Sequence, residues 1–222
     1  MGQATLTRFV DEQGRPDFDG VAANRNELDE FVAYVARVSP ATSPELFPRR
    51  ADVLAYHLNA YNALAMKGVI DEGVTDGFSN FFKRQTFFRV RKVMVGGRSM
   101  SLSTYEDDVI RPLGEPRVHF GLNCMVRSCP RLPQSAFNAD ELEAQLQGAA
   151  REFVNDPRNV RVDAAARELW LSSIFDFYTD DFAPDGKRES LIAYMNRYRD
   201  EPLDPEFAIK FIPYDWTLNR QR

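Results

Sequence analysis

The stretch RRADVLAYHLNAYNALAMKGVI, residues 49–70, carries the longest helical pattern in this 222-residue sequence. Its apolar side chains recur every three or four positions and form one broad stripe. The stripe consists of Val53, Leu54, His57, Leu58, Tyr61, Leu64, Ala65, Gly68 and Val69. Because His57 lies inside this stripe, we expect it to be a buried packing residue rather than a ligand or a base. The pattern predicts a long, largely buried helix.

Two asparagines, Asn59 and Asn62, lie three positions apart on this helix and are therefore neighbours on one side of it. An amide in the middle of a helix lowers helix propensity, and a buried amide needs hydrogen-bond partners. The pair could orient a histidine, as an asparagine does in papain-like Cys-His-Asn sites, or it could bind the backbone of another segment. We expect the helix to pack beside residues 117–130, whose irregular backbone has groups to offer.

Further helices and strands are predicted before and after this helix in the sequence. We expect helices over 24–38, 101–110, 138–154, 172–182 and 187–198, hairpins over 87–102 and 159–172, a strand over 117–122, and a strand or extended tail over 207–219. Helices and hairpins without regular βαβ alternation indicate the α+β class. The length favours a single domain over residues 1–222, with helices packed on a mostly antiparallel sheet; a papain- or transglutaminase-like arrangement is one candidate.

The composition bounds the kind of partner that the chain can have. The net charge is -5, so no global basic field attracts nucleic acid, and no apolar run reaches membrane-spanning length. The first residues, MGQATLTRFVDEQGRPD, contain no apolar h-region, so we expect no signal peptide in the given sequence. We expect a small-molecule or peptide-like ligand, no nucleic acid, no integral membrane segment, no cofactor and no metal.

The stretch RVHFGLNCMVRSCPRLP, residues 117–133, contains both cysteines and one of the two histidines. Pro130 favours the first position of a helix, which would place Cys129 at the N-cap with backbone N–H groups facing its sulfur. Nearby arginines would stabilise the thiolate further, and His119 on the adjoining strand could act as its base. The stretch therefore predicts a nucleophilic Cys129.

Three other interpretations of the two cysteines stay open. Cys124 and Cys129 could form a disulfide, both could be small buried apolar residues, or they could bind a metal. The spacing H-x4-C-x4-C matches no common zinc pattern, so metal is the weakest of these alternatives. A ligand in the same place would contact Asn62, Asn123, Cys124 and Arg127.

Glu106 and a group of three aspartates could take part in chemistry. Glu106 could orient His119, although its spacing from Ser103 is that of a capping box and gives it a structural role. The stretch FDFYTDDF, residues 175–182, offers Asp176, Asp180 and Asp181, which lack the pattern of a calcium loop. One of these aspartates could belong to a carboxylate pair for hydrolysis.

The stretch FSNFFKRQTFFRVRK, residues 78–92, mixes aromatic and basic side chains. Such a mixture occurs in platforms that bind single-stranded nucleic acid. The acidic composition of the whole chain weakens that interpretation. Core aromatic residues flanked by solvated cations are the better account.

Four stretches together resemble the family called domain of unknown function 547. They are YHLNAYNAL, VHFGLNCMVRSCPRL, LWLSSIFDFYTDDF and FIPYDWTLN, in the order and spacing typical of that family, over about residues 50–219. The helix over 24–38 would pack on this core. The positions that match recurring ones are Asn59, Asn62, His119, Cys124, Cys129, Pro130, Asp181 and Asp215. The chain differs in carrying His57 where relatives commonly have tryptophan, and Asp107 where they have histidine.

The resemblance implies an exported bacterial protein more than it implies a reaction, and it supplies no established activity. If a leader was removed, we expect a periplasmic or cell-envelope location, and otherwise a cytoplasmic one. Our first functional hypothesis is a thiol-dependent hydrolase or acyl transferase acting on an amide or ester. In it Cys129 is the nucleophile, His119 the base, and Asn59 or Glu106 the orienting group. The second is a non-catalytic binding module of the envelope with a Cys124–Cys129 disulfide, and the third an enzyme that uses carboxylates.

Overall fold

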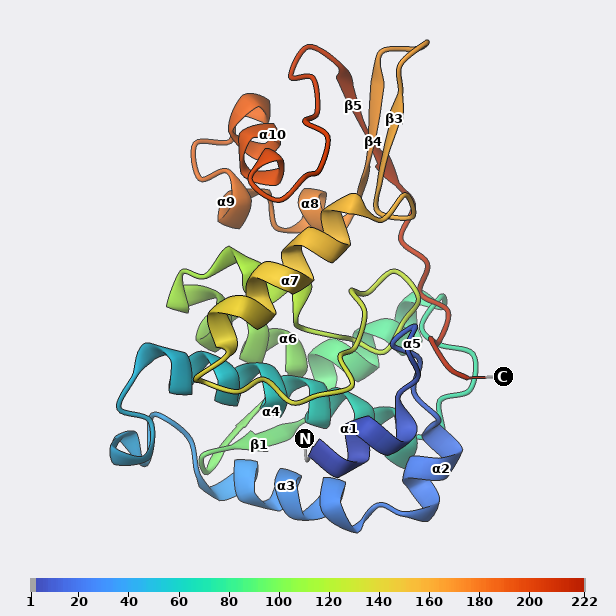
Figure 1. The fold of residues 1–222 in the computed structure, drawn as a ribbon. Helices are drawn as coiled ribbons and strands as arrows, with labels where there is room; N and C mark the ends of the chain where they lie inside the picture. The colour runs from blue at the N-terminus through green and yellow to red at the C-terminus, as the bar shows by residue number, and fades with distance from the viewer. Residues whose placement is uncertain (1–2, 222) are drawn as a thin grey trace.

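The computed structural model describes residues 3–221 and has a mixed α+β fold (Figure 1). Ten α-helices and two small sheets are found in this part of the chain. The α-helices are α1 (Gln3–Phe9), α2 (Phe18–Ala23), α3 (Asn26–Arg37), α4 (Arg50–Asp71), α5 (Phe81–Gln85), α6 (Leu102–Tyr105), α7 (Leu142–Asn155), α8 (Ile174–Phe177), α9 (Thr179–Phe182) and α10 (Arg188–Asn196). The predicted α+β class is therefore confirmed.

The strands form two separate sheets rather than one layer that carries all the helices. They are β1 (Val93–Val95), β2 (Arg98–Met100), β3 (Val160–Asp163), β4 (Glu168–Ser172) and β5 (Ala208–Ile212). β1 and β2 pair antiparallel, as do β3 and β4, whereas β5 adds to β4 in parallel. The two sheets lie at opposite ends of the molecule, with α4 close to the first and α10 close to the second (Figure 1).

Helix α4 is the centre of the larger part of the fold, as its sequence predicts. It is buried along most of its length, including fully buried positions such as Leu58, Ala63 and Met66. Helix α3 packs along it on one side, and α6 and the turn that follows pack on another. Burial on more than one side explains why its apolar positions form such a broad stripe rather than a narrow one.

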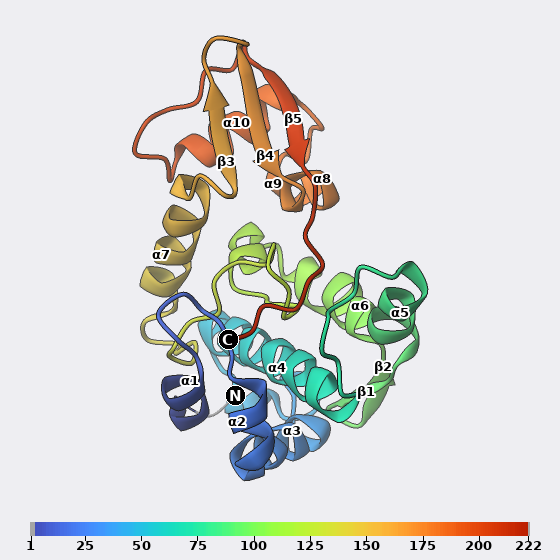
Figure 2. The ribbon, with the colours of Figure 1, turned by 90° about the vertical axis from the view of Figure 1, so that its right-hand side faces the viewer.

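The apolar side chains gather into two clusters that α7 connects. The larger cluster surrounds α4, and the smaller one lies between β4, α8, α9 and α10. On α7, Leu142 and Leu146 belong to the larger cluster, whereas Phe153 and Val154 belong to the smaller one. The chain after β5 runs back toward α4, which ties the C-terminal end to the larger cluster (Figure 2).

The hairpin predicted over 87–102 is confirmed only around its turn. Gly96 and Gly97 both have positive φ, 54° and 75°, as a two-residue turn requires. Residues Thr86–Val90 form a π-helical turn that continues α5. Phe87 and Phe88, which are adjacent and would face opposite sides of a strand, are both buried there.

The strand predicted over 117–122 is wrong. Residues Pro116–Phe120 form a 3₁₀-helix, in which the N–H of Val118 donates to the carbonyl of Glu115. Proline at the first position fixes the φ that a helical turn needs. His119 and Phe120 are both buried, so the apparent alternation does not separate an inner from an outer face.

The predicted capping box of Ser103 and Glu106 also differs from the structure. Ser101, not Ser103, caps α6, because its hydroxyl accepts from the N–H of Thr104. The side chain of Glu106 is therefore free to face the cavity described below. Helix α3 begins at Asn26 and α7 at Leu142, and neither has a side-chain cap. Among residues 3–221, no helix combines the length and apolar character needed to cross a bilayer.

Candidate ligand-binding site

A cavity of about 400 Å³ opens where α8 and the C-terminal segment meet the body built on α4. Its walls come from α4, α5 and the π-helical turn, the turn after α6, the segment 119–130, α8 and the chain after β5. The lining residues are Tyr61, Arg84, Gln85, Phe88, Arg89, Ser103, Glu106, Asp107, Arg111, His119, Leu122, Cys124, Cys129, Pro130, Ile174, Phe177, Tyr178, Tyr214 and Trp216. Segments that are far apart in the sequence thus build one site.

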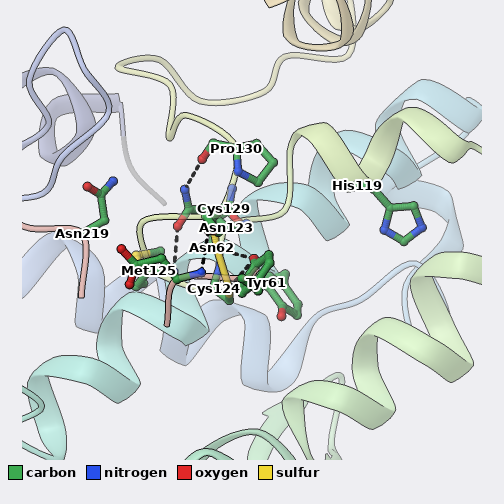
Figure 3. The surroundings of a disulfide bond; sticks show 12 residues. Tyr61, Asn62, His119, Asn123, Cys124, Met125, Cys129, Pro130 and Asn219 are labelled. Carbon is green, nitrogen blue, oxygen red and sulfur yellow. Dashed lines mark hydrogen bonds between the residues drawn. A yellow bond between two sulfur atoms is a disulfide. The ribbon is translucent and has the colours of Figure 1, made fainter. Parts of the chain in front are cut away.

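The irregular chain between residues 121 and 130 is held in place by two asparagine side chains. Asn62 donates to the carbonyl of Gly121 at 2.9 Å and accepts from the N–H of Asn123 at 2.7 Å. Asn123 in turn donates to the carbonyl of Pro130 at 2.7 Å (Figure 3). The prediction that α4 packs beside this segment is confirmed, because buried amides pair with its backbone.

The two cysteines are joined in a disulfide that forms part of the cavity wall. The hydroxyl of Tyr214 lies 3.6 Å from the sulfur of Cys124 and 3.4 Å from that of Cys129. The N–H of Cys124 donates to the Cys129 sulfur at 3.1 Å. Among residues 3–221 no free cysteine is present, so a thiolate is not available in this structure.

The prediction that Cys129 caps a helix is wrong. The chain from 121 to 141 has no helix, and the next one begins only at Leu142. The carbonyl of Pro130 accepts a hydrogen bond from the side chain of Asn123, and no helical turn begins at this residue. Arg127, one of the arginines near the two cysteines, has a side chain that is 59% exposed and lies 3.9 Å from Asp215.

His119 is buried and held in one orientation. Its Nε2 lies 2.6 Å from Oδ2 of Asp181, and its ring stacks on Tyr178 with 3.9 Å between the ring centroids. Only 1% of the His119 side chain is exposed. Because the carboxylate accepts from Nε2–H, the neutral ring has its unprotonated nitrogen at Nδ1. That nitrogen lies 3.9 Å from Oε1 of Glu106.

Asp181 is shared between His119 and Arg111. The guanidinium of Arg111 donates to both carboxylate oxygens, at 2.7 and 3.2 Å, and also to Asp107 at 2.9 Å. Burial alone would raise the pKa of Asp181, but the hydrogen bonds from His119 and Arg111 outweigh it and lower that pKa to about 2. The carboxylate is therefore ionised at neutral pH and fixes the imidazole.

Glu106 is the acidic group that faces His119 across the cavity wall. Its second oxygen accepts from the hydroxyl of Tyr61 at 3.0 Å. Burial, together with the nearby charge of Glu106, raises the pKa of both Tyr61 and Tyr178 far above the ordinary value. These two phenols stay protonated and can serve only as neutral hydrogen-bonding groups.

Asn59, which was expected to orient His119, lies away from it. Its side chain exchanges hydrogen bonds with the backbone of Phe137, at 2.8 and 3.0 Å, and is not bonded to His119. The group bonded to His119 is Asp181. His57 is buried and bonded to Tyr105 at 2.7 Å, as the packing interpretation predicts. Within residues 3–221, no cluster of three or more histidine, cysteine or acidic side chains is arranged to hold a metal.

Sequence reasoning missed several cavity residues. Tyr178, Tyr214 and Trp216 lie in the last two stretches that carry the family resemblance, so the resemblance could have drawn attention to them. Arg111 offers only its spacing of four from Asp107, which predicts a helical ion pair but not its bond to Asp181. That contact joins residues 70 positions apart.

Comparison with known proteins agrees with the resemblance over the middle of the chain, residues 47–154. No curated protein and no solved structure matches. The third and fourth stretches of the resemblance, near residues 169–182 and 211–219, lie outside the region that a family model matches. The predicted family is confirmed over residues 47–154, which match the model described as "Protein of unknown function, DUF547".

Proposed function

We propose that this protein is a binding module that takes a peptide-like small molecule into the cavity beside the disulfide. The observation that carries the proposal is the position of the Cys124–Cys129 bond in the cavity wall, with Tyr214 against both sulfurs. A disulfide in this place shapes the wall and removes the nucleophile that a thiol enzyme would need.

The lining chemistry supports a ligand that has both apolar and charged groups. Aromatic rings from Phe88, Phe177 and Trp216 offer flat apolar surface, and most ligand sites are largely apolar with a few placed polar groups. Arg84 and Arg89 on one side and Glu106 on another supply both signs of charge. A short peptide or a modified amino acid carries the matching amine, carboxylate and side chain.

Tryptophan fluorescence provides a direct test, because one of the two tryptophans lines the cavity and the other does not. Trp216 lies in the wall, whereas Trp170 lies on β4. Titration with a panel of short peptides that contain an aromatic residue should give a saturable change in emission. We expect the Trp170→Phe variant to keep that change and the Trp216→Phe variant to lose it.

Calorimetric titration of the same peptides checks binding without relying on fluorescence. Exchange of Glu106 for glutamine should weaken a bound peptide that carries an amine by about tenfold, the usual effect of losing one charge-assisted hydrogen bond. Absence of heat with every peptide, in the folded protein with its disulfide intact, would contradict the proposed ligand class.

A second candidate is an acid–base enzyme that uses Glu106 and His119 and leaves the cysteines structural. The specific observation in its favour is the bond between Asp181 and Nε2 of His119, which leaves Nδ1 facing Glu106. A base oriented by a carboxylate is a recurring arrangement in hydrolysis. The thiol enzyme of our first hypothesis would require reduction of the disulfide before any turnover.

Hydrolysis of a peptide and an ester substrate separates these alternatives. A carboxylate–histidine enzyme should act without reductant, keep its rate in the Cys124→Ser/Cys129→Ser double variant and lose most of it in Glu106→Gln. A thiol enzyme should act only after reduction and fail in the double variant. No turnover under either condition, combined with peptide binding, leaves the binding module as the function.

We also propose that the protein works in an oxidising compartment, in line with the exported location that the resemblance implies. A disulfide persists in such compartments and is rare in reducing ones. Alkylation of intact cells before lysis, followed by fractionation and mass measurement, should find the bonded form outside the cytoplasm. Recovery of the protein from cytoplasm with two alkylated thiols would contradict this location.

A further inference from the structure

The segment from Phe81 to Lys92 exposes an unusual amount of apolar surface. The three most exposed large apolar side chains among residues 3–221 all belong to it, namely Phe82 (78%), Val90 (64%) and Phe81 (56%). Positions 82, 86 and 90 are exposed at the four-residue spacing of one helical face, whereas Phe87 and Phe88 point inward. Single exposed apolar residues are ordinary, but a group of them is typical of an interaction surface.

The same segment is strongly basic in an acidic protein. Residues 81–92 include five cations and no acidic residue, while the whole chain has a net charge of -5. Arg91 pairs with Glu72 at 3.1 Å, and Arg84 stacks over Trp216 with its guanidinium 4.6 Å from the ring. Lys83 and Lys92 are exposed, and neither forms an ion pair with any described residue.

We propose that α5 and the π-helical turn after it bind the surface of an anionic lipid bilayer. Exposed phenylalanines beside lysine and arginine are the pattern by which interfacial helices enter the headgroup region. The apolar rings would enter the boundary between headgroups and acyl chains, and the cations would pair with lipid phosphates. Helix α5 lies at one edge of the molecule, away from α7 and from the β3–β5 sheet, where a flat surface can approach it (Figure 2).

This placement would bring the cavity close to the bilayer, because the inner side of the same segment lines the cavity. Arg84 and Gln85 are part of its wall. The inference does not depend on which ligand the cavity holds. Its test therefore uses residues that do not line the cavity, so that loss of membrane binding and loss of ligand binding can be told apart.

Vesicle sedimentation of the full chain tests the proposal. We expect the protein to sediment with vesicles of phosphatidylcholine mixed with phosphatidylglycerol but not with phosphatidylcholine alone, and added salt should release it. The Phe81→Ser/Phe82→Ser variant should bind the anionic vesicles about tenfold less tightly. The Lys83→Glu/Lys92→Glu variant, which keeps both rings, should lose binding by at least about as much.

Two matched controls carry the same kinds of change elsewhere on the surface. The Leu46→Ser variant removes another exposed apolar side chain, and Arg37→Glu/Arg161→Glu makes an equal change in net charge. Both should bind vesicles as the unmodified protein does. Equal binding to neutral and anionic vesicles, or full binding by both test variants, would overturn the proposal. Saturable binding of single-stranded nucleic acid, or self-association through the same residues, without vesicle binding would contradict the proposal. The surface would then serve that other partner.

Discussion

At the scale of single residues, the site depends on polar side chains that are buried and fully committed to partners. Asn62 pairs with both Gly121 and Asn123, and His119 is fixed by Asp181 and the Tyr178 ring. A buried polar group that loses its partner costs more free energy than the bond itself contributes, because it is not resolvated. Substitutions at these positions should therefore be felt in stability as well as in binding.

Replacement of Asn62 by leucine should lower the free energy of unfolding by about 1–3 kcal/mol, because the carbonyl of Gly121 and the N–H of Asn123 would be left unpaired. Urea denaturation at neutral pH measures the difference. The matched control is Asn24→Leu on the exposed C-terminal end of α2, which should change stability little. An unchanged unfolding midpoint for Asn62→Leu would show that the segment 121–130 does not need this anchor.

His57 should make stability depend on pH between about 4 and 6.5. Burial lowers its pKa from 6.5 to about 4 in the folded protein. Folding favours the neutral form of His57. Its contribution to the free energy of unfolding is therefore fully present above pH 6.5 and declines as the pH falls, because the unfolded chain binds the proton first. The loss by pH 4 should be about 3 kcal/mol.

Urea denaturation at pH 7 and at pH 4.5 checks this contribution, with His57→Gln as the comparison. The variant lacks the titrating group, so the part of the pH dependence that belongs to His57 should disappear. Carboxylates such as Asp181 titrate lower and should contribute equally to both proteins in this range. An equal loss of unfolding free energy between pH 7 and pH 4.5 in both proteins would exclude a depressed pKa at His57.

At the scale of elements, the disulfide and α7 can be tested separately. The bond between Cys124 and Cys129 closes a short loop, and closing such a loop stabilises a protein by about 2 kcal/mol in the chain-entropy model. We expect purified protein, alkylated in denaturant without reductant, to show no modified thiol by mass. The Cys124→Ser/Cys129→Ser variant should unfold at a lower urea concentration, and its free energy of unfolding should be lower by about 2 kcal/mol. Two rapidly alkylated thiols in the native protein would restore Cys129 as a candidate nucleophile.

Gly148 lies within α7, and a side chain added there meets no atom within 4 Å. Gly148→Ala should therefore stabilise the protein by about 0.5–1 kcal/mol, since glycine is the less favourable residue inside a helix. Gly121→Ala is the matched comparison, because its new carbon would lie 2.9 Å from the Phe137 ring. That variant should be destabilised. Thermal melts of both proteins measure the two opposite shifts.

The elements that sequence reasoning predicted well are those specified by local signals. The long apolar stripe predicts α4, and the Gly96–Gly97 pair predicts the turn between β1 and β2. The alternating apolar residues of 117–122 match the pattern of a strand, whereas Pro116 starts a 3₁₀-helix whose two sides are both buried. The bond between Asp181 and His119 depends on tertiary packing, and nothing within either stretch predicts it.

At the scale of the whole molecule, α7 joins the two apolar clusters through a continuous helix. Leu146 packs in the larger cluster and Phe153 in the smaller one, seven residues further along the helix. Disruption at either end should therefore destabilise both clusters. Differential scanning calorimetry should give one transition for the unmodified protein and one transition at lower temperature for both Leu146→Ala and Phe153→Ala. Two separate transitions would mean that the clusters unfold independently.

The return of the C-terminal segment to α4 has a consequence for the order in which the protein matures during synthesis. Tyr214 and Trp216 complete the cavity, and residues 217 and 218 pair with Gly77 and Val126. Every other residue that lines the cavity lies between Tyr61 and Tyr178, so synthesis from the N-terminus makes those walls first. The cavity is therefore complete only once the segment after β5 has been made and has docked.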